Sequence, residues 1–357
     1  MSLFIFIEAL PAVGTSIYLM FFFSRLIKYF HRMNVLLYII IILICLALCI
    51  PTINFFNAYS FMYYYFVAFC ALFGLISHFL KDGKVKLLFQ SGLLSFVCLA
   101  LVVAYGWMNM HHVVRTDFYV SSKKVSDLKI LAISDLHGDE VITSKQLEKY
   151  VQKMNKVKPD LIALAGDIFD ERTRKSVMIA QAKTLGKLKS KYGTYYVYGN
   201  HDDQKYGNTM NSNTERFSGS DIKEEMEKNA IRVLDDQSVN VGKNIVVVGR
   251  RDASYSRASS QNLLKKVDHN KYIIVLDHQP LDMSENAKNG ADLQVSGHTH
   301  GGQIWPIGYV QAIATKTMRY GVKHIGDFSC VTTSGIAGWG YPFKIGAKAE
   351  YAVIHVK

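Results

Sequence analysis

The sequence predicts an N-terminal α-helical membrane region followed by an α/β domain. Three observations lead to this fold class. Hydrophobic residues make up 50% of the 357 residues, and they concentrate in residues 1–110. From residue 127 onward, short apolar segments alternate with amphipathic ones, which is the pattern of strands and helices around a sheet buried on both faces. Five short segments rich in Asp, Asn and His each follow an apolar segment in this second region.

The first region contains enough apolar sequence for about four membrane helices. A helix needs roughly 20 apolar residues to cross a bilayer, and four segments qualify, near 3–23, 35–55, 57–80 and 87–108. The chain starts Met1-Ser2-Leu3-Phe4, without the basic residues that begin a cleaved signal peptide, so we expect the first helix to be retained. Glu8 in that helix is either an interfacial residue or an intramembrane carboxylate with a function.

Charged residues predict how these helices are oriented. Positive charge lies in two short loops, at Arg25, Lys28 and Arg32 and at Lys81, Lys84 and Lys86. The positive-inside rule places both loops in the cytoplasm. With four helices, everything after residue 108 would then lie outside. We therefore expect a multi-pass protein of the cell membrane with an extracytoplasmic domain; three helices would reverse this orientation.

After a polar connector at 111–126, residues 127–357 form the expected soluble domain. Strands are expected at 128–133, 160–165, 195–198, 245–248, 272–275 and 293–295, because each is short and apolar. Helices are expected at 145–154, where apolar residues form one stripe, and at 174–190 and 221–228. Residues 203–219, rich in Asn, Ser and Gly, are expected to form a loop. Short strands and Gly-rich turns alternate over 327–357, which favours added antiparallel strands.

Charge limits the partners of this domain. After residue 110 the chain has 35 basic and 27 acidic residues, an excess of eight positive charges. This excess is either a solvated surface or a means of attracting an anionic lipid surface or substrate. No Arg and aromatic residues cluster as nucleic-acid binding requires, so we expect no nucleic-acid partner. The lipid bilayer is the expected partner, and the sequence does not predict the oligomeric state.

The five polar segments have the composition of a metal site. In open α/β sheets, ligands bind beyond the carboxyl ends of the strands, and all five segments occupy that position. Their carboxylate, amide and imidazole groups suit Mn, Fe or Zn, and the sequence does not choose among these metals. In extended backbone, the spacing of His298 and His300 would direct both rings to the same side. The segments are 135–137 (DLH), 166–170 (GDIFD), 199–202 (GNHD), 277–280 (DHQP) and 297–302 (GHTHGG).

In order and spacing, these segments resemble those of the calcineurin-like metallophosphoesterases over about residues 128–357. The segment 334–340 (SGIAGWG) also resembles a bacterial membrane-anchored branch of that family. The resemblance implies a sandwich of two mixed β-sheets flanked by helices, and two divalent metal ions. It implies that one ion is held by Asp135, His137, Asp167 and His300, and the other by Asp167, Asn200, His278 and His298.

The resemblance also implies a reaction. A hydroxide bridging the two ions would attack phosphorus in line, His201 would protonate the leaving oxygen, and Asp202 would orient His201. We therefore expect a membrane-anchored, metal-dependent phosphoesterase, acting as a phosphodiesterase or pyrophosphatase on an amphiphilic or envelope phosphate ester, with lipid-linked substrates included. The alternative is a non-hydrolytic metal-binding scaffold or a membrane sensor with the same fold. Arg250 and Arg251, in a loop after a strand, are candidates to bind the substrate phosphate.

Overall fold

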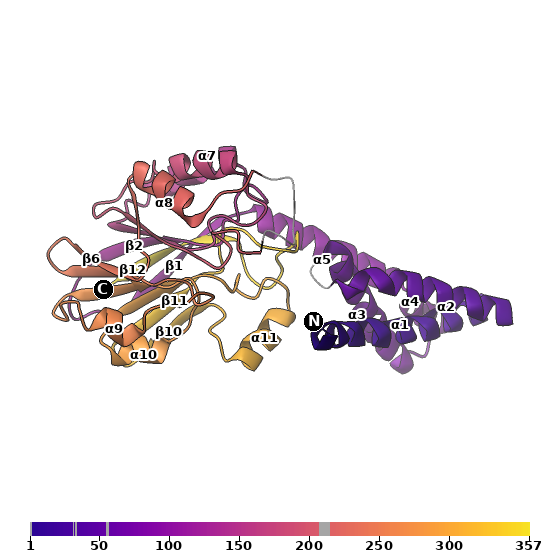
Figure 1. Cartoon of the computed structure of the whole chain (residues 1–357). Helices are drawn as coiled ribbons and strands as arrows, with labels where there is room; N and C mark the ends of the chain where they lie inside the picture. Colours follow the sequence, from indigo (N-terminus) through magenta and orange to yellow (C-terminus); the bar gives the residue numbers. More distant parts are fainter. Residues whose placement is uncertain (1, 31, 33, 55–56, 207–214) are drawn as a thin grey trace. The chain divides into compact units, whose positions relative to one another are not determined.

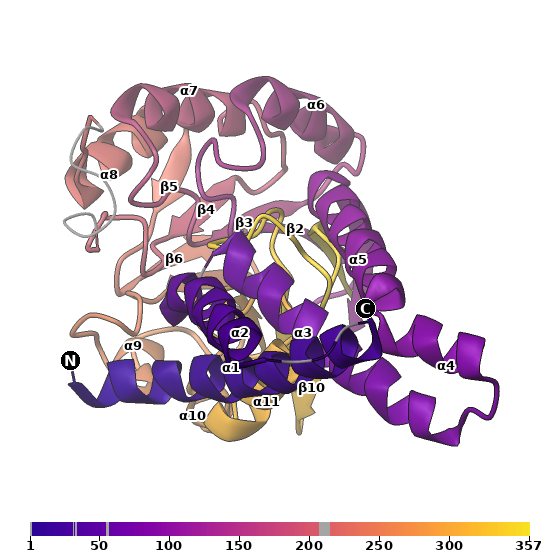
Figure 2. The same ribbon diagram turned by 90° about the vertical axis from the view of Figure 1, so that its right-hand side faces the viewer.

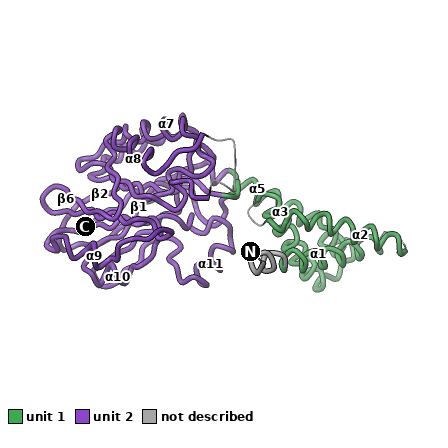
Figure 3. Tube along the Cα trace, in the orientation of Figure 1, with its two compact units in different colours: residues 1–107, 340–343 green, residues 108–339, 344–357 purple. Residues whose placement is uncertain are grey.

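The computed structural model describes residues 2–30, 32, 34–54, 57–206 and 215–357. It divides into two compact units, one of residues 1–107 with 340–343 and one of residues 108–339 with 344–357 (Figure 3). The side chain of Glu8, and residues 207–214 within the loop expected at 203–219, lie outside the described residues. The two units are described separately below.

The described residues of the first unit form mainly helices. Among the described residues, four helices are long and apolar enough to cross a membrane, at Leu10–Tyr29, Val35–Ile53, Ala58–Phe79 and Leu93–His111. This finding confirms the four apolar helices. Asn34 and Asn57 begin two of them, because each side chain accepts a hydrogen bond from the first turn. The described helices are α1 (Ser2–Phe30), α2 (Val35–Cys49), η1 (Ile50–Ile53), α3 (Ala58–Ile76), η2 (Ser77–Phe79), α4 (Gly83–Gln90) and α5 (Leu93–His111).

The described residues of the second unit form two six-stranded mixed sheets. The first sheet has the order β1-β12-β2-β3-β4-β5, in which the β12–β2 pair is antiparallel and the other pairs are parallel. Its strands are β1 (Val114–Val120), β2 (Leu128–Ile133), β3 (Leu161–Ala165), β4 (Thr194–Val197), β5 (Ile231–Val233) and β12 (Glu350–Val356).

The second sheet has the order β10-β11-β9-β8-β7-β6, with antiparallel pairs at its two edges and parallel pairs between them. Its strands are β6 (Gln237–Val241), β7 (Ile245–Gly249), β8 (Tyr272–Leu276), β9 (Leu293–Ser296), β10 (Gly321–Ile325) and β11 (Phe328–Thr332).

Apolar side chains from both sheets pack against each other in one cluster, so the sheets form a sandwich (Figure 1). The helices α6 (Ser144–Asn155), α7 (Lys175–Leu185) and α8 (Gly219–Lys228) cover the outer face of the first sheet (Figure 2). The short helices α9 (Ser260–Leu264) and α10 (Met283–Lys288) cover the outer face of the second. The expected fold class, an apolar helical region plus a sandwich of two mixed sheets flanked by helices, is confirmed.

Several elements differ from the sequence-based expectation. The segment 111–126, expected to be a connector, contains β1, which pairs with β12 along its whole length. Because β1 is an edge strand, only Phe118 and Val120 enter the core, and its other residues keep the polar character that hid the strand. In the tail, β11 is antiparallel to β10 and β12 is antiparallel to β2, as expected, but each also has a parallel neighbour, β9 and β1 respectively. The helix α11 (Ile307–Thr315) was not expected.

Candidate metal centre

The side chains proposed as ligands come from loops that follow five strands of both sheets. Asp135 and His137 follow β2, Asp167 follows β3, and Asn200 follows β4, all in the first sheet. His278 follows β8, and His298 and His300 follow β9, in the second sheet. Two clusters of side chains form where these loops meet.

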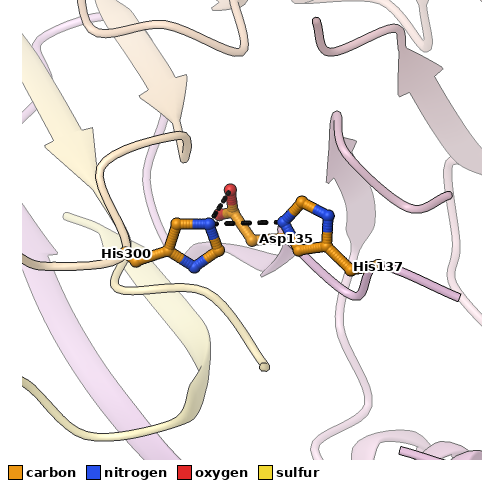
Figure 4. Close-up of side chains that lie close together, drawn as sticks. All are labelled: Asp135, His137 and His300. Atoms are coloured by element: carbon orange, nitrogen blue, oxygen red, sulfur yellow. Dashed lines mark hydrogen bonds and ion pairs between the residues drawn. The ribbon is translucent and has the colours of Figure 1, made fainter. Parts of the chain in front are cut away.

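The first cluster consists of Asp135, His137 and His300, whose potential ligand atoms all lie within 4.8 Å of one another (Figure 4). Nε2 of His137 lies 3.3 Å from Nε2 of His300, which in turn lies 3.7 Å from Oδ1 of Asp135. Burial lowers the pKa of His137 well below its ordinary value and that of His300 to about 4. Both rings are therefore neutral at pH 7, the form that binds a metal ion.

The second cluster consists of Asp167, His278 and His298, again within 4.8 Å of one another. Nε2 of His278 lies 3.0 Å from Oδ2 of Asp167. Nδ1 of His298 lies 3.0 Å from Oδ1 of Asn200, so the amide oxygen joins the same group. The backbone N–H of His298 donates to Oδ1 of Asp135 at 2.9 Å, which ties the two clusters together.

The hydrogen bonds of His278 test whether this cluster fits a cation. Its Nδ1 lies 2.8 Å from the carbonyl oxygen of Ala165, which only accepts, so Nδ1 carries a proton. In the neutral ring Nε2 is then an acceptor that faces the carboxylate of Asp167, an arrangement that a metal ion would stabilise. Burial disfavours the charged ring, but the charge of Asp167 outweighs it and raises the pKa of His278 well above its ordinary value. The raised pKa favours a second proton, on Nε2, and a metal ion between His278 and Asp167 would take the place of that second proton.

Buried polar atoms without hydrogen-bond partners also indicate that these side chains could hold metal ions. Among the described residues, Nδ1 of His137 and Nδ1 of His300 are buried without a hydrogen-bond partner. Such atoms are uncommon in folded proteins and indicate a missing ion or a functional role. Together with the carboxylates of Asp135 and Asp167, these imidazoles form a donor set that suits divalent transition metals.

The backbone of these loops is unusual. Five of the seven proposed ligands have positive φ: Asp135 (56°), His137 (52°), Asp167 (50°), His298 (71°) and His300 (49°). Non-glycine residues rarely adopt this conformation, and it concentrates at functional sites. Gly199 allows two of the loops to meet, because a Cβ there would lie 2.1 Å from Oδ1 of Asp167. The Gly in the segment 199–202 is therefore required by close packing.

His298 and His300 do not lie in extended backbone, so the expectation that their rings share one side is wrong. Positive φ at both residues turns the chain, and a Thr299 N–H to Gly297 carbonyl bond of 2.9 Å tightens the turn. His298 consequently enters the second cluster and His300 the first. This division agrees with the assignment implied by the family resemblance.

His201 lies beside both clusters and outside the ligand groups. Its backbone N–H donates to Oδ1 of Asp167 at 2.9 Å, and its Nδ1 lies 2.8 Å from a carboxylate oxygen of Glu171. The ring of Trp339 lies against it, with centroids 4.7 Å apart. Glu171 thus fixes the orientation of the ring and leaves Nε2 as its second donor.

Asp202 does not orient His201, so that expectation is wrong. Its carboxylate is fully buried and accepts three backbone N–H groups, from Asp167 (2.7 Å), Phe169 (2.9 Å) and Gly199 (2.6 Å). These bonds join the loops that follow β3 and β4. Asp202 therefore holds the backbone that positions Asp167.

Comparison with known proteins identifies this arrangement. The family model described as calcineurin-like phosphoesterase matches residues 128–302, which contain all seven proposed ligands. Residues 128–302 belong to a calcineurin-like phosphoesterase domain. Proteins of this family generally hydrolyse phosphoesters with metal ions, and the fold normally binds two divalent metals.

Relatives of the phosphoesterase domain include membrane proteins. An uncharacterized metallophosphoesterase of Helicobacter pylori strain J99 is 27% identical over 284 residues, covering 75% of this chain and 72% of the relative. A Bos taurus transmembrane protein with metallophosphoesterase domain is 27% identical over 235 residues, covering 63% of this chain and 52% of the relative. The crystal structure of TT1561 of Thermus thermophilus shares 16% identity at a TM-score of 0.41, over 59% of this chain and 90% of that one.

The two arginines predicted to bind substrate phosphate have different surroundings in the phosphoesterase domain. Arg250 is 2% exposed, and its Nη1 lies 3.1 Å from Asp277 and 2.9 Å from Asp282. Arg251 forms two hydrogen bonds to Asp235, of 2.8 and 2.6 Å. The buried guanidinium of Arg250 is occupied by carboxylates of the same domain, so the expectation that it binds substrate phosphate is wrong. The side chain of Arg251 is 47% exposed and lines a pocket together with Gly199, so its role in binding substrate phosphate stays a prediction.

Arg250 is instead expected to stabilise the domain. We expect Arg250→Met to lower the free energy of unfolding by about 3 kcal/mol, because breaking a buried ion pair leaves a carboxylate without its full compensation. The measurement is the melting temperature of the whole chain in detergent. Arg251→Met is the matched control, since its exposed pair should contribute less than about 1 kcal/mol. Equal melting temperatures of the two variants would contradict this role of Arg250.

Two acidic residues beside the clusters were given no role by the sequence analysis. Glu171 orients His201, and Asp170 lies 3.6 Å from Nδ1 of His137, behind the first cluster. Burial raises the pKa of Asp170 to about 7. Both residues lie in the loop after β3 that also supplies Asp167. The sequence signal that could have indicated them is the three carboxylates within residues 167–171, in the loop that follows β3.

Proposed function

We propose that this protein is a membrane-anchored, dimetal-dependent phosphohydrolase that cleaves phosphodiester or pyrophosphate bonds. The observation that supports this most strongly is the pair of ligand clusters, each with one carboxylate and two imidazoles, joined by the bond from His298 to Asp135. Each cluster offers deprotonated or neutral donors to one divalent ion. His201 lies beside the clusters and is held by Glu171, a position suited to proton transfer.

The proposed roles divide between metal ions and side chains. Two divalent ions bound here would generate a nucleophile from water near neutral pH and stabilise charge on the phosphoryl oxygens. Asp135, His137 and His300 would hold one ion, and His278, His298 and Asn200 the other. Asp167, in the second cluster and hydrogen-bonded to the loop of His201, is proposed to bridge them. Mn, Fe and Zn all suit these donors.

His201 is proposed to be the general acid. Glu171 accepts the proton of Nδ1, so Nε2 is available to donate to the leaving oxygen. Burial lowers the pKa of His201, but the hydrogen bond to Glu171 and the charge of Asp167 raise it above its ordinary value. A larger fraction of His201 therefore carries the transferable proton near neutral pH.

The membrane region favours an amphiphilic substrate. Four apolar helices and the relatives named as transmembrane proteins indicate a membrane protein. An enzyme attached to a bilayer, with an excess of positive charge, suits an anionic phosphate ester that is itself membrane-bound or lipid-linked. The basic loops at Arg25–Arg32 and Lys81–Lys86 favour an extracytoplasmic position of the phosphoesterase domain at the cell membrane. Digestion of the domain by protease added to intact cells would support this side, and protection would contradict it.

Metal removal tests the proposed function. We expect the full chain in detergent to bind two equivalents of divalent metal and to hydrolyse an aryl phosphodiester. Chelation should abolish turnover, and manganese should restore it, because the nucleophile depends on the ions. The measurements are metal content by mass spectrometry and release of the chromophore. Bound metal without turnover of phosphodiester, pyrophosphate or phosphomonoester substrates would instead favour a non-hydrolytic scaffold.

A further inference from the structure

The helix α11 of the phosphoesterase unit exposes an unusual set of apolar side chains. Among the described residues from 112 onward, eight large apolar side chains are exposed, and five of these lie within the nine residues 305–313. The five are Trp305 (56% exposed), Ile307 (39%), Tyr309 (42%), Val310 (63%) and Ile313 (79%). A patch of this kind on a soluble domain marks a surface that is covered in the functional state.

The patch belongs to one face of a short amphipathic helix. No residue of α11 is buried in the part of the chain that the structure describes. Ile307, Val310 and Ile313 recur at intervals of three, and Tyr309 borders the same face, whereas Gln311 and Thr315 lie on the other side. In Figure 1, α11 projects from the edge of its unit, away from the helices that cover the two sheets.

The charge and residue types around α11 match a lipid surface. Residues 301–320 contain no Asp or Glu, and their two charged residues are Lys316 and Arg319. Lys316 is exposed, at the carboxyl end of the helix. Trp and Tyr side chains favour the interfacial layer of a bilayer, and basic residues favour its anionic lipids.

A bilayer is also the surface that the chain itself keeps within reach. The apolar helix α5 ends at His111, and only His112 and Val113 separate it from β1 of the domain. We propose that α11, together with Trp305, inserts its apolar face into the interfacial layer of the bilayer in which the same chain is anchored. Residues 301–320 offer no acidic side chain that an anionic lipid surface would repel.

The helix α11 is coupled to the metal-binding loop. The side chain of Thr299 donates to the carbonyl oxygen of Arg319, and the guanidinium of Arg319 donates to the carbonyl oxygen of Gly301. Gly308 packs so closely that a Cβ there would lie 2.2 Å from Cα of Gly302. Insertion of α11 would thus hold the loop of His298 and His300 near the surface of the bilayer. This consequence rests on the proposed function; the insertion itself does not.

Lipid quenching tests the insertion independently of activity. The full chain is reconstituted into anionic phospholipid vesicles with brominated acyl chains, and its fluorescence is compared with that of Trp305→Phe, which isolates the signal of Trp305. We expect a loss of this signal relative to vesicles without bromine. An unquenched Trp305 that is open to aqueous acrylamide would overturn the proposal. An unquenched Trp305 that is shielded from acrylamide would overturn it too, in favour of a protein partner or a second copy.

A double variant tests the consequence for turnover. We expect the double variant Val310→Ser, Ile313→Ser to hydrolyse a phosphate ester presented in vesicles at least about tenfold more slowly. Removing one buried apolar side chain is expected to weaken the equilibrium constant for insertion by about tenfold. Turnover of a water-soluble aryl phosphodiester should be unchanged. Ile179→Ser, at another exposed apolar residue, is the control and should affect neither. Equal loss on both substrates would overturn the proposal. If the wild type hydrolyses neither, the proposed function fails and the quenching experiment alone decides the insertion.

Discussion

Replacing Asp167 with alanine is expected to abolish metal-dependent turnover and to remove at least one of the two metal equivalents. Oδ2 of Asp167 lies 3.0 Å from Nε2 of His278, and Oδ1 accepts the backbone N–H of His201. This carboxylate, fully buried in the second cluster, is the proposed bridge between the ions. Loss of a residue that merely supports a ligand weakens metal binding by about 10–100-fold, so loss of the bridge should reduce turnover by at least about 10³-fold.

Controls for this prediction separate the loss of a ligand from the loss of the fold. Asp167→Asn keeps the shape of the side chain and one acceptor for the His201 N–H, and should still lose most of its turnover. Asp327→Ala removes a carboxylate that is 81% exposed and paired with Lys123 on the surface, and should leave turnover unchanged. Turnover is measured with an aryl phosphodiester and metal by mass spectrometry. Wild-type turnover in Asp167→Ala would refute the assignment of the site.

The position of the candidate metal centre could be predicted from the sequence because it depends on local patterns. Strands such as 128–133 and 160–165 are recognisable from their apolar side chains, and the loop after a parallel strand lies at a known edge of the sheet. Asp135 and Asp167 are therefore brought to one place by the strand pattern alone. The ligand type was equally accessible, since carboxylate and imidazole groups have the same chemistry in any fold.

The orientation of individual side chains could not be predicted, because it depends on backbone dihedral angles and on contacts distant in sequence. His298 and His300 are two residues apart but enter different clusters, because both adopt positive φ. Asp202 is adjacent to His201 but turns toward the backbone of the neighbouring loop, whereas Glu171, thirty residues earlier, reaches the ring. The ion pair of Arg250 with Asp277, 27 residues away in the chain, is likewise not predictable from the sequence around Arg250.

His201→Ala is expected to retain both metal ions but to slow the cleavage of esters with poor leaving groups. No ligand cluster contains His201, so metal content should be unchanged. General acid catalysis contributes about 10²–10⁴-fold, and the loss should be greatest for alkyl esters, whose leaving oxygen needs a proton most. Turnover of an aryl ester with a good leaving group should fall far less. Equal losses for both esters would contradict a role in protonation.

The substitution Glu171→Gln tests the role of His201 in a second way, through the pH dependence of kcat/KM. Burial lowers the pKa of His201, but the hydrogen bond to Glu171 and nearby negative charge raise it above its ordinary value. Removal of the Glu171 charge should therefore lower this pKa. Because a general acid is active only while protonated, the alkaline limb of the profile of kcat/KM against pH should move to lower pH.

The acidic side of that profile provides the internal control. Well below both pKa values His201 is protonated in either protein, so wild type and Glu171→Gln should differ little there. Glutamine still accepts the hydrogen bond of Nδ1, which preserves the orientation of the ring. A residue that only supported the fold would lower turnover by the same factor at every pH. A shift of the alkaline limb confined to Glu171→Gln, with unchanged metal content, would therefore assign the proton donor to His201 and its positioning to Glu171.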